Sequence, residues 1–345
     1  MPSYFLQEIF IMKKIYTYQW CKIVLSVIIL SLIISCSGKT FTIKKWKQYS
    51  EFTGRVWDVS FSPKGTYLSI SIAENQFEIY NNKFQSIWRN KGNLQEVGRC
   101  TFSPDESLLA LTKYIEESSI AIIRTRDFEI IQLLQGHQDW VNCVDFSPNG
   151  QFLASGSDDR FIKLWKKSNN AFIEYQSFED HTKYVSDIKF SPNNQFLASS
   201  SGDSTIVIRE FKDGVYTKKH TFNTQERSIH TIAFSPDSQI LASGSYTGKI
   251  MVFEYDGKNF NPLPPFEGHK KMVKSIKFSP NGKYMASASW DKTITIWKIE
   301  KNQFTKLQTL TDHKSHIDTL SFSPNGTYMA SGSDDHSMII WKLRN

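Results

Sequence analysis

The chain has 345 residues, a formal net charge of +7, and 14% aromatic and 22% charged residues. This mixture is typical of a globular chain with a large core and argues against disorder after residue 41. The positive charge is spread along the sequence and forms no basic stripe interleaved with aromatic residues, so nucleic-acid binding is not indicated.

Residues 1–36 differ in character from the rest of the chain. Met12-Lys13-Lys14 is followed, after a polar patch, by an apolar run over residues 23–34. A helix that spans a bilayer needs about 20 apolar residues, so this shorter run predicts the core of a signal peptide. An uncleaved signal anchor or an amphipathic segment is the alternative interpretation.

The apolar run ends at Ile33-Ile34-Ser35-Cys36, which resembles the lipobox of bacterial lipoproteins. The resemblance implies cleavage before Cys36 and attachment of lipid to its thiol. It therefore implies a membrane-associated, extracytoplasmic protein. The residues ahead of Met12 do not fit this pattern.

From residue 41 onward the chain consists of repeats. The tripeptide Phe-Ser-Pro marks them, and its Phe lies at Phe61, Phe102, Phe146, Phe190, Phe234, Phe278 and Phe322. After a first step of 41 residues every step is 44 residues, which requires stacked or radially repeated units. The predicted units are residues 51–82, 83–126, 127–170, 171–213, 214–258, 259–302 and 303–345.

Each unit contains four predicted strands. In the clearest copy, residues 273–278, 284–289 and 293–297 are short runs separated by turn residues, and a further run precedes the Gly-His pair. A ring of small sheets shortens and covers the edges that would otherwise promote aggregation. The prediction is an all-β, seven-bladed β-propeller of four-stranded antiparallel blades, closed by residues 42–49 as the outer strand of the last blade.

Polar residues recur at fixed distances from each Phe-Ser-Pro. A His lies nine residues before the Phe, and a Ser, an Asp and a Trp lie nine, thirteen and nineteen residues after it. Three units carry all four residues, and unit four has Arg209 in place of the Trp. These predicted structural tetrads comprise His137, Ser155, Asp159, Trp165, His181, Ser199, Asp203, His269, Ser287, Asp291, Trp297, His313, Ser331, Asp335 and Trp341.

The pairs Gly136-His137 and Leu164-Trp165, and their counterparts in unit six, resemble the WD-repeat β-propeller family. The resemblance covers the chain from residue 41 to its end and implies that each tetrad forms one hydrogen-bonded network. A Ser-His-Asp catalytic triad is the alternative. The structural interpretation is favoured because the set repeats from unit to unit, includes a Trp that no hydrolase requires, and has no marked cleft or oxyanion hole.

Other candidate sites are weaker. Units one, two and five lose most of the tetrad, and we expect their blades to rely on apolar packing. His313 and His316 could suggest a metal pair, but His313 belongs to a tetrad and no third ligand accompanies them. Cys100 and Cys143 are expected to be buried free thiols. No catalytic residue, metal or cofactor is predicted.

The family resemblance implies that partners dock on the top of the propeller, the end that carries the His loops and the Asp turns. Large aromatic side chains beside these loops are unlikely to serve the core, and Trp and Tyr are common anchors of binding surfaces. The predicted partner-binding residues are Trp140, Asp158, Tyr184, Tyr246, Met272, Trp290, His316 and Asp334.

The sequence thus predicts a non-catalytic scaffold that binds one or more proteins or peptides through its top face. It is predicted to bind no nucleic acid and no small-molecule substrate, and to be tethered to a membrane through its N-terminus. The main alternative is a soluble cytoplasmic scaffold subunit of a multiprotein complex with an unprocessed N-terminal extension. An enzyme built on a propeller is the less favoured alternative.

Overall fold

Short β-strands make up the part of the chain that the computed structural model describes, which comprises residues 41–90, 97–113 and 119–344. These residues form twenty-nine strands. None of the described residues belongs to a helix that could cross a membrane. The predicted signal segment over residues 1–36 and the predicted lipidation site Cys36 lie outside the described residues.

The strands form seven sheets. The first three sheets are β2 (Val56–Phe61), β3 (Tyr67–Ile72), β4 (Gln76–Asn81) and β5 (Ser86–Arg89); β6 (Val97–Phe102), β7 (Leu108–Lys113), β8 (Ile120–Arg124) and β9 (Glu129–Leu134); and β10 (Val141–Phe146), β11 (Phe152–Ser157), β12 (Ile162–Ser168) and β13 (Ala171–Phe178). The fourth and fifth are β14 (Val185–Phe190), β15 (Phe196–Ser201), β16 (Thr205–Lys212) and β17 (Val215–Asn223); and β18 (Ile229–Phe234), β19 (Ile240–Ser245), β20 (Lys249–Tyr255), β21 (Phe260–Pro262) and β22 (Phe266–Glu267). The last two are β23 (Val273–Phe278), β24 (Tyr284–Ser289), β25 (Ile294–Glu300) and β26 (Gln303–Leu310); and β1 (Thr42–Tyr49), β29 (Ser337–Arg344), β28 (Tyr328–Ser333) and β27 (Ile317–Phe322).

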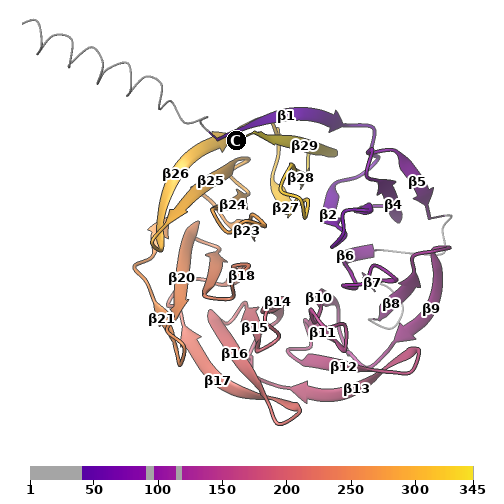
Figure 1. The fold of residues 1–345 in the computed structure, drawn as a ribbon, viewed down its shortest axis with the longest axis vertical. Coiled ribbons are helices and arrows are strands. Elements are labelled where there is room, and N and C mark those ends of the chain that lie inside the picture. Colours follow the sequence, from indigo (N-terminus) through magenta and orange to yellow (C-terminus); the bar gives the residue numbers. More distant parts are fainter. Residues whose placement is uncertain (1–40, 91–96, 114–118, 345) are drawn as a thin grey trace, which may run out of the picture. The chain divides into compact units, whose positions relative to one another are not determined.

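The seven sheets are arranged as blades around a central channel (Figure 1). The first strand of each blade, such as β2 or β27, lies nearest the channel, and the last lies on the outside. The prediction of a seven-bladed propeller with antiparallel blades is therefore confirmed.

The ring is closed by the two ends of the propeller. β1 pairs with β29 and is the outermost strand of blade seven, so this blade combines one N-terminal strand with three C-terminal strands. Closure by residues 42–49 is as predicted.

The predicted units and the blades are out of phase by one strand. β9 begins predicted unit three but pairs with β8 in blade two, and β26 begins unit seven but pairs with β25 in blade six. Units and blades therefore do not share their bounds, and closure of the last blade by residues 42–49 requires this offset. Each repeat instead supplies the outer strand of the preceding blade, which interlocks neighbouring blades.

Blade five has an interrupted outer edge. β20 pairs first with β21 and then separately with β22. Pro264 and Pro265 lie between these two short strands, and proline has no backbone N–H to donate to a ladder. Asn261 and Pro262, just ahead of these prolines, still pair with β20.

Neighbouring blades share their cores. One apolar cluster joins Val56 and Ile70 of blade one to Ala330 and Ile340 of blade seven. A Cβ placed on Gly332 would lie 2.5 Å from Val56 Cγ1, so the backbone of blade seven can approach blade one this closely only at a glycine.

The outer strands are also tied from blade to blade by glutamines that recur at the repeat spacing. The Gln132 side chain accepts from Phe172 N at 2.8 Å and donates to Phe172 O at 2.7 Å. Gln308 makes the same pair of bonds with Ile43, at 3.1 and 2.8 Å, and Gln176 accepts from Tyr216 N at 3.0 Å. These clasps join β9 to β13, β13 to β17, and β26 to the closing strand β1.

Candidate functional site

The tetrad of blade three forms a closed network of hydrogen bonds. His137 Nδ1 lies 2.8 Å from Asp159 Oδ2, and His137 Nε2 lies 2.8 Å from Ser155 Oγ. Trp165 Nε1 donates to the same Ser155 Oγ at 2.9 Å. The pattern assigns the proton of the imidazole to Nδ1, since Asp159 can only accept and the Ser155 hydroxyl can donate to Nε2. The network ties the loop before β10 to the turn after β11 and to β12.

The tetrads of blades six and seven have the same contacts. They comprise His269, Ser287, Asp291 and Trp297, and His313, Ser331, Asp335 and Trp341. Burial alone would raise the pKa of Asp291, but hydrogen bonds from His269, Thr293 and Lys270 N outweigh it and hold this pKa below its usual range. The Asp of each of these tetrads is therefore a carboxylate at neutral pH.

These networks are not arranged as hydrolase active sites. Ser331 is fully buried, and its oxygen already contacts the imidazole and the indole. A nucleophile must reach a substrate from an open cleft. The Ser-His-Asp trio of each tetrad is therefore arranged to hold the blade together and not to attack a substrate.

Blade four replaces the indole by a guanidinium. His181 still contacts Ser199 at 2.8 Å, and its Nδ1 lies 3.4 Å from Asp203. Arg209 instead pairs with the buried Asp180 at 2.6 Å and stacks 3.6 Å from the Phe178 ring. From the sequence, blade four, like blades one, two and five, is expected to rely on apolar packing because it lacks a full tetrad. This expectation is wrong for blade four, because a charged pair and a cation–π contact occupy the Trp position.

Blades one and five also have polar ties of their own. In blade five, Glu226 pairs with Lys249 at 3.0 Å and accepts from the Thr247 hydroxyl. In blade one, the buried Glu78 pairs with Arg89 at 2.7 Å. Apolar packing alone therefore does not account for these blades either.

The top loops of the blades share a backbone contact that brings the predicted partner-binding residues together in pairs. Asp158 N donates to Trp140 O at 2.9 Å, and Asp334 N donates to His316 O at the same distance. Equivalent bonds link Trp290 to Met272, Gly202 to Tyr184 and Tyr246 to Ser228. In blade one and in blades three to seven, the residue six before the Phe thus lies beside the residue twelve after it.

The predicted partner-binding residues differ in how far their side chains are exposed to solvent. Trp140 is 53% exposed and Tyr246 is 41% exposed, which is unusual for such large apolar groups. Met272 is only 5% exposed, so its side chain belongs to the core of this structure and its role in partner binding stays a prediction. Burial is the favourable state for its apolar thioether side chain. We call the other seven the rim residues: Trp140, Asp158, Tyr184, Tyr246, Trp290, His316 and Asp334.

The rim residues of blades six and seven form a compact polar and aromatic cluster. The Trp290 and His316 rings are stacked, with centroids 4.7 Å apart and planes 7° apart. Trp290 Nε1 donates to Asp318 Oδ1 at 3.0 Å, and His316 Nδ1 lies 3.3 Å from Asp334. Burial and the neighbouring Asp318 raise the pKa of Asp334 to about 6.

Two cavities open beside Trp140 at the mouth of the channel. They have volumes of about 320 and 530 Å³, and Trp57, Trp140, Asn142 and Lys274 line both. Trp57 also stacks under Arg55 at 3.7 Å. The sequence analysis missed Trp57, although it lies four residues before its Phe, the position that Lys274 holds in blade six.

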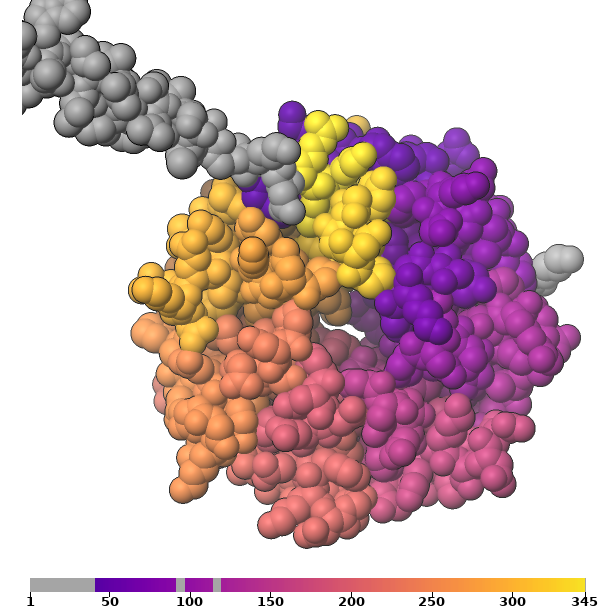
Figure 2. Space-filling view, viewed as in Figure 1, coloured from indigo at the N-terminus to yellow at the C-terminus, as the bar shows by residue number. Residues whose placement is uncertain are grey.

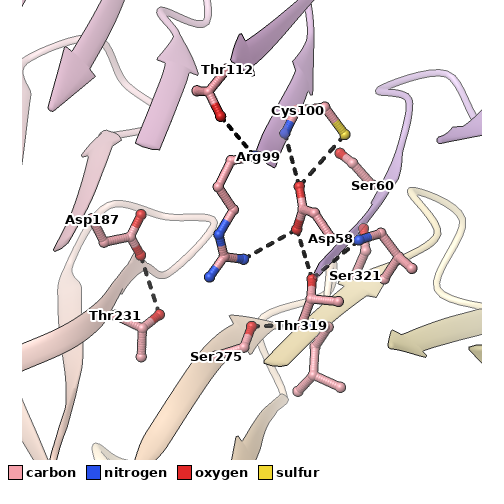
Figure 3. A network of polar contacts seen from close by, with 12 residues as sticks. Asp58, Ser60, Arg99, Cys100, Thr112, Asp187, Thr231, Ser275, Thr319 and Ser321 are labelled. Atoms are coloured by element: carbon pink, nitrogen blue, oxygen red, sulfur yellow. Dashed lines mark hydrogen bonds and ion pairs between the residues drawn. The ribbon is translucent and has the colours of Figure 1, made fainter. Parts of the chain in front are cut away.

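A second missed set lines the channel itself, at the position three residues before each Phe (Figure 3). Side chains at this position accept the backbone N–H of the residue two before the Phe in the next blade. The bonds are Cys100 N to Asp58, Ile232 N to Asp187, Ile276 N to Thr231, Leu320 N to Ser275 and Val59 N to Thr319. They join consecutive blades around most of the ring.

We looked for a metal site and for reactive cysteines among the described residues. Within residues 41–90, 97–113 and 119–344, no group of three His, Cys, Asp or Glu side chains could hold a metal ion. Cys100 and Cys143 are buried free thiols, as expected, and burial raises the pKa of both.

Comparison with known families agrees with this geometry. A model described as the IFT122 first beta-propeller matches residues 96–309, which is more than half of the chain, and a model of the WD domain, G-beta repeat, matches residues 304–342. The chain is a member of the WD-repeat β-propeller family.

Individual relatives of this WD-repeat protein match only in part. An uncharacterized WD repeat-containing protein of Synechocystis is 28% identical over 36% of the chain and 36% of its own length. A probable cytosolic Fe-S cluster assembly factor of Schizosaccharomyces pombe is 29% identical over 34% of the chain and 20% of its own length. The mouse intraflagellar transport protein 122 homolog is 32% identical over 26% of the chain and 7% of its own length. The matches therefore cover between 7% and 36% of the length of these relatives.

Proposed function

We propose that this WD-repeat propeller is a non-catalytic scaffold that binds a protein or peptide through its rim residues. The observation that carries the proposal is the exposure of Trp140 and Tyr246 on the top loops. Large aromatic groups lose little conformational entropy on binding and are the commonest anchors of protein interfaces.

The surroundings of Trp140 support the same proposal. Two cavities lie beside this ring, and a carboxylate, Asp158, lies directly next to it along the backbone contact. A pocket beside an exposed aromatic anchor can receive a side chain of the partner. The buried tetrads favour structural support over catalysis, and the match to an intraflagellar transport propeller is consistent with a role among other proteins.

The experiment is affinity capture with the wild-type protein, a double variant of the rim residues, and a control variant whose substituted side chain is as exposed as Trp140. Trp140→Ala combined with Tyr246→Ala should reduce recovery of the specific partner at least tenfold, since each lost anchor contributes on the order of 2 kcal/mol. Ile173→Ala removes an equally exposed side chain from the outer strand β13 and should leave recovery unchanged. Equal recovery by the double variant would contradict the proposal.

We also propose that the protein is tethered to a membrane outside the cytoplasm through Cys36. This proposal rests on the lipobox-like stretch 33–36 and the apolar run before it. Cys36→Ala should move the full chain from the membrane fraction to the soluble fraction. Recovery of the wild-type protein in the soluble fraction with an intact N-terminus would favour the alternative, a cytoplasmic scaffold.

A further inference from the structure

The central channel contains an unusual concentration of charge. Figure 2 shows that the channel is open at the centre of the ring. Below its mouth lies a cavity of about 200 Å³. The charged residues that line it are Asp58, Arg99, Asp145, Asp187, Lys189, Lys274 and Lys277. They come from the strands β2, β6, β10, β14 and β23, each of which is the innermost strand of its blade.

The carboxylates of this cavity already have partners. Asp58 accepts from Arg99 at 3.2 Å and from the Thr319 hydroxyl at 2.8 Å (Figure 3). Lys189 lies 3.2 Å from Asp187 and 3.9 Å from Asp145. One guanidinium and one ammonium group therefore contact the three carboxylates of blades one, three and four.

Lys274 and Lys277 have no such partner. Neither forms an ion pair within 4.0 Å with any residue of the described ranges, although both are largely removed from bulk water. Burial lowers the pKa of both lysines and so does the charge of Arg99, while the carboxylate of Asp187, which is not in contact with either, opposes this lowering in part. A partly buried ammonium group without an ion pair is less favourable than one that is in contact with an anion.

Two hydroxyl groups on the same side of the channel can donate a hydrogen bond. Ser275 Oγ accepts from Leu320 N at 3.2 Å, and Ser321 Oγ accepts from Phe61 N at 3.0 Å. The proton of each hydroxyl has no acceptor among the residues that the structure describes. Both serines line the cavity together with Lys274 and Lys277.

We propose that this cavity binds an oxyanion, a carboxylate or a phosphate, between Lys274 and Lys277. The two ammonium groups and the hydroxyls of Ser275 and Ser321 supply only donors, which is the set that an anionic oxygen needs. A water molecule requires roughly 10–15 Å³ of such space, so the cavity is large enough for a tetrahedral oxyanion with accompanying water. The site lies inside the channel and uses none of the rim residues.

The first test is calorimetric titration of the full-length protein with inorganic phosphate. We expect a single site, with binding weakened on the order of tenfold or more in Lys277→Met and in Lys274→Met, because each loses one charge-assisted bond. Lys277→Arg keeps the positive charge and should retain binding. Lys283→Met, an exposed lysine on the bottom turn of the same blade, should bind phosphate as the wild type does.

A second titration distinguishes the two sources of the anion. A pentaglutamate peptide presents the carboxylate of a partner's side chain, whereas inorganic phosphate represents a free anion. Binding of either probe that is lost in Lys277→Met and retained in Lys283→Met supports the site and identifies the source. If neither probe binds, or if both bind the Lys277→Met protein as they bind the wild type, the proposal is wrong.

Folding of the variants can be checked independently. Lys277→Met removes an unpaired charge from a partly buried place and adds an apolar side chain of similar length. Its melting temperature without phosphate should therefore equal or exceed that of the wild type. Phosphate should raise the melting temperature of the wild type but not of the variant. A variant that is stable and still stabilised by phosphate contradicts the proposal.

Discussion

At the scale of single residues, one serine hydroxyl connects the other members of each complete tetrad. Ser287 Oγ lies 2.7 Å from His269 Nε2 and accepts from Trp297 Nε1 at 2.9 Å. Ser243 holds the same position in blade five, where its buried oxygen has no hydrogen-bond partner in the described structure. The chain thus contains both a fully bonded serine and its matched control.

Ser287→Ala should lower the free energy of unfolding by about 1–3 kcal/mol, because it leaves the buried His269 Nε2 and Trp297 Nε1 without a hydrogen-bond partner. Ser243→Ala should change it by less than about 0.5 kcal/mol, since no bond is lost. Urea unfolding of the two variants measures the difference. Equal effects of the two substitutions would show that the tetrad contributes nothing beyond packing.

The rim residue Asp334 should make the free energy of unfolding depend on pH. Burial and Asp318 raise its pKa to about 6, above the value of about 3.9 in an unfolded chain. The folded protein therefore holds this proton more tightly, so the free energy of unfolding should fall as the pH rises from about 4 to 6 and stay low above that.

Asp334→Asn should remove this part of the pH dependence. Between pH 5 and pH 8 the wild type should lose on the order of 1 kcal/mol more than the variant. Urea unfolding at the two pH values measures this difference. His316→Gln in both backgrounds controls for the neighbouring imidazole, and an identical loss in variant and parent would refute the account.

Sequence spacing located the tetrads, because identical residues recur at one step of 44. It could not locate the substitute in blade four, since Arg209 pairs with Asp180, which stands where units three and six have the Gly of the Gly-His pair. The burial of Met272 was also not visible, because Trp140 and Tyr184 follow their His at the same distance and are more exposed. Substitutions unique to one blade require the structure.

At the scale of elements, the closing strand β1 determines whether the ring is continuous. Its residue Ile43 is buried and exchanges two hydrogen bonds with the Gln308 side chain of blade six. Without β1, the edge of β29 would be an unpaired strand in contact with water, and such edges promote association between chains.

Gln308→Leu should cost about 1–2 kcal/mol of unfolding free energy, because two hydrogen bonds to the closing strand are lost. Gln303→Leu on the same strand is the matched control and should be nearly neutral. A chain that begins at residue 50 should melt at a lower temperature and associate more than one that begins at residue 41. Thermal melting and size-exclusion chromatography measure these effects, and indistinguishable truncations would refute closure by β1.

The strands and the closing role of residues 42–49 were predictable from the sequence, but the pairing that assigns each outer strand to its blade is seen only in the structure. Hydrogen bonds between β8 and β9 place residues 129–134 in blade two, and the local sequence of this strand fits either neighbouring blade equally well. The glutamine clasps could have been found from the common spacing of Gln132, Gln176 and Gln308. Their function depends on the outer strands of adjacent blades lying side by side, which only the three-dimensional arrangement shows.

At the scale of the whole molecule, structural and binding roles are separated. Buried tetrads, glutamine clasps and channel hydrogen bonds hold the blades together, while the top loops leave Trp140 and Tyr246 exposed. A rigid ring presents such loops at fixed positions, so a partner can bind several blades at once with little loss of conformational entropy in the scaffold.

Photo-crosslinking tests this division most directly. Benzoylphenylalanine at position 140 or 246 places a reactive group within the proposed interface, and the same residue at position 173 places it on the outer wall. The account predicts crosslinks to a shared partner from positions 140 and 246 and none from position 173. Crosslinks from position 173 alone, with none from the rim, would contradict it.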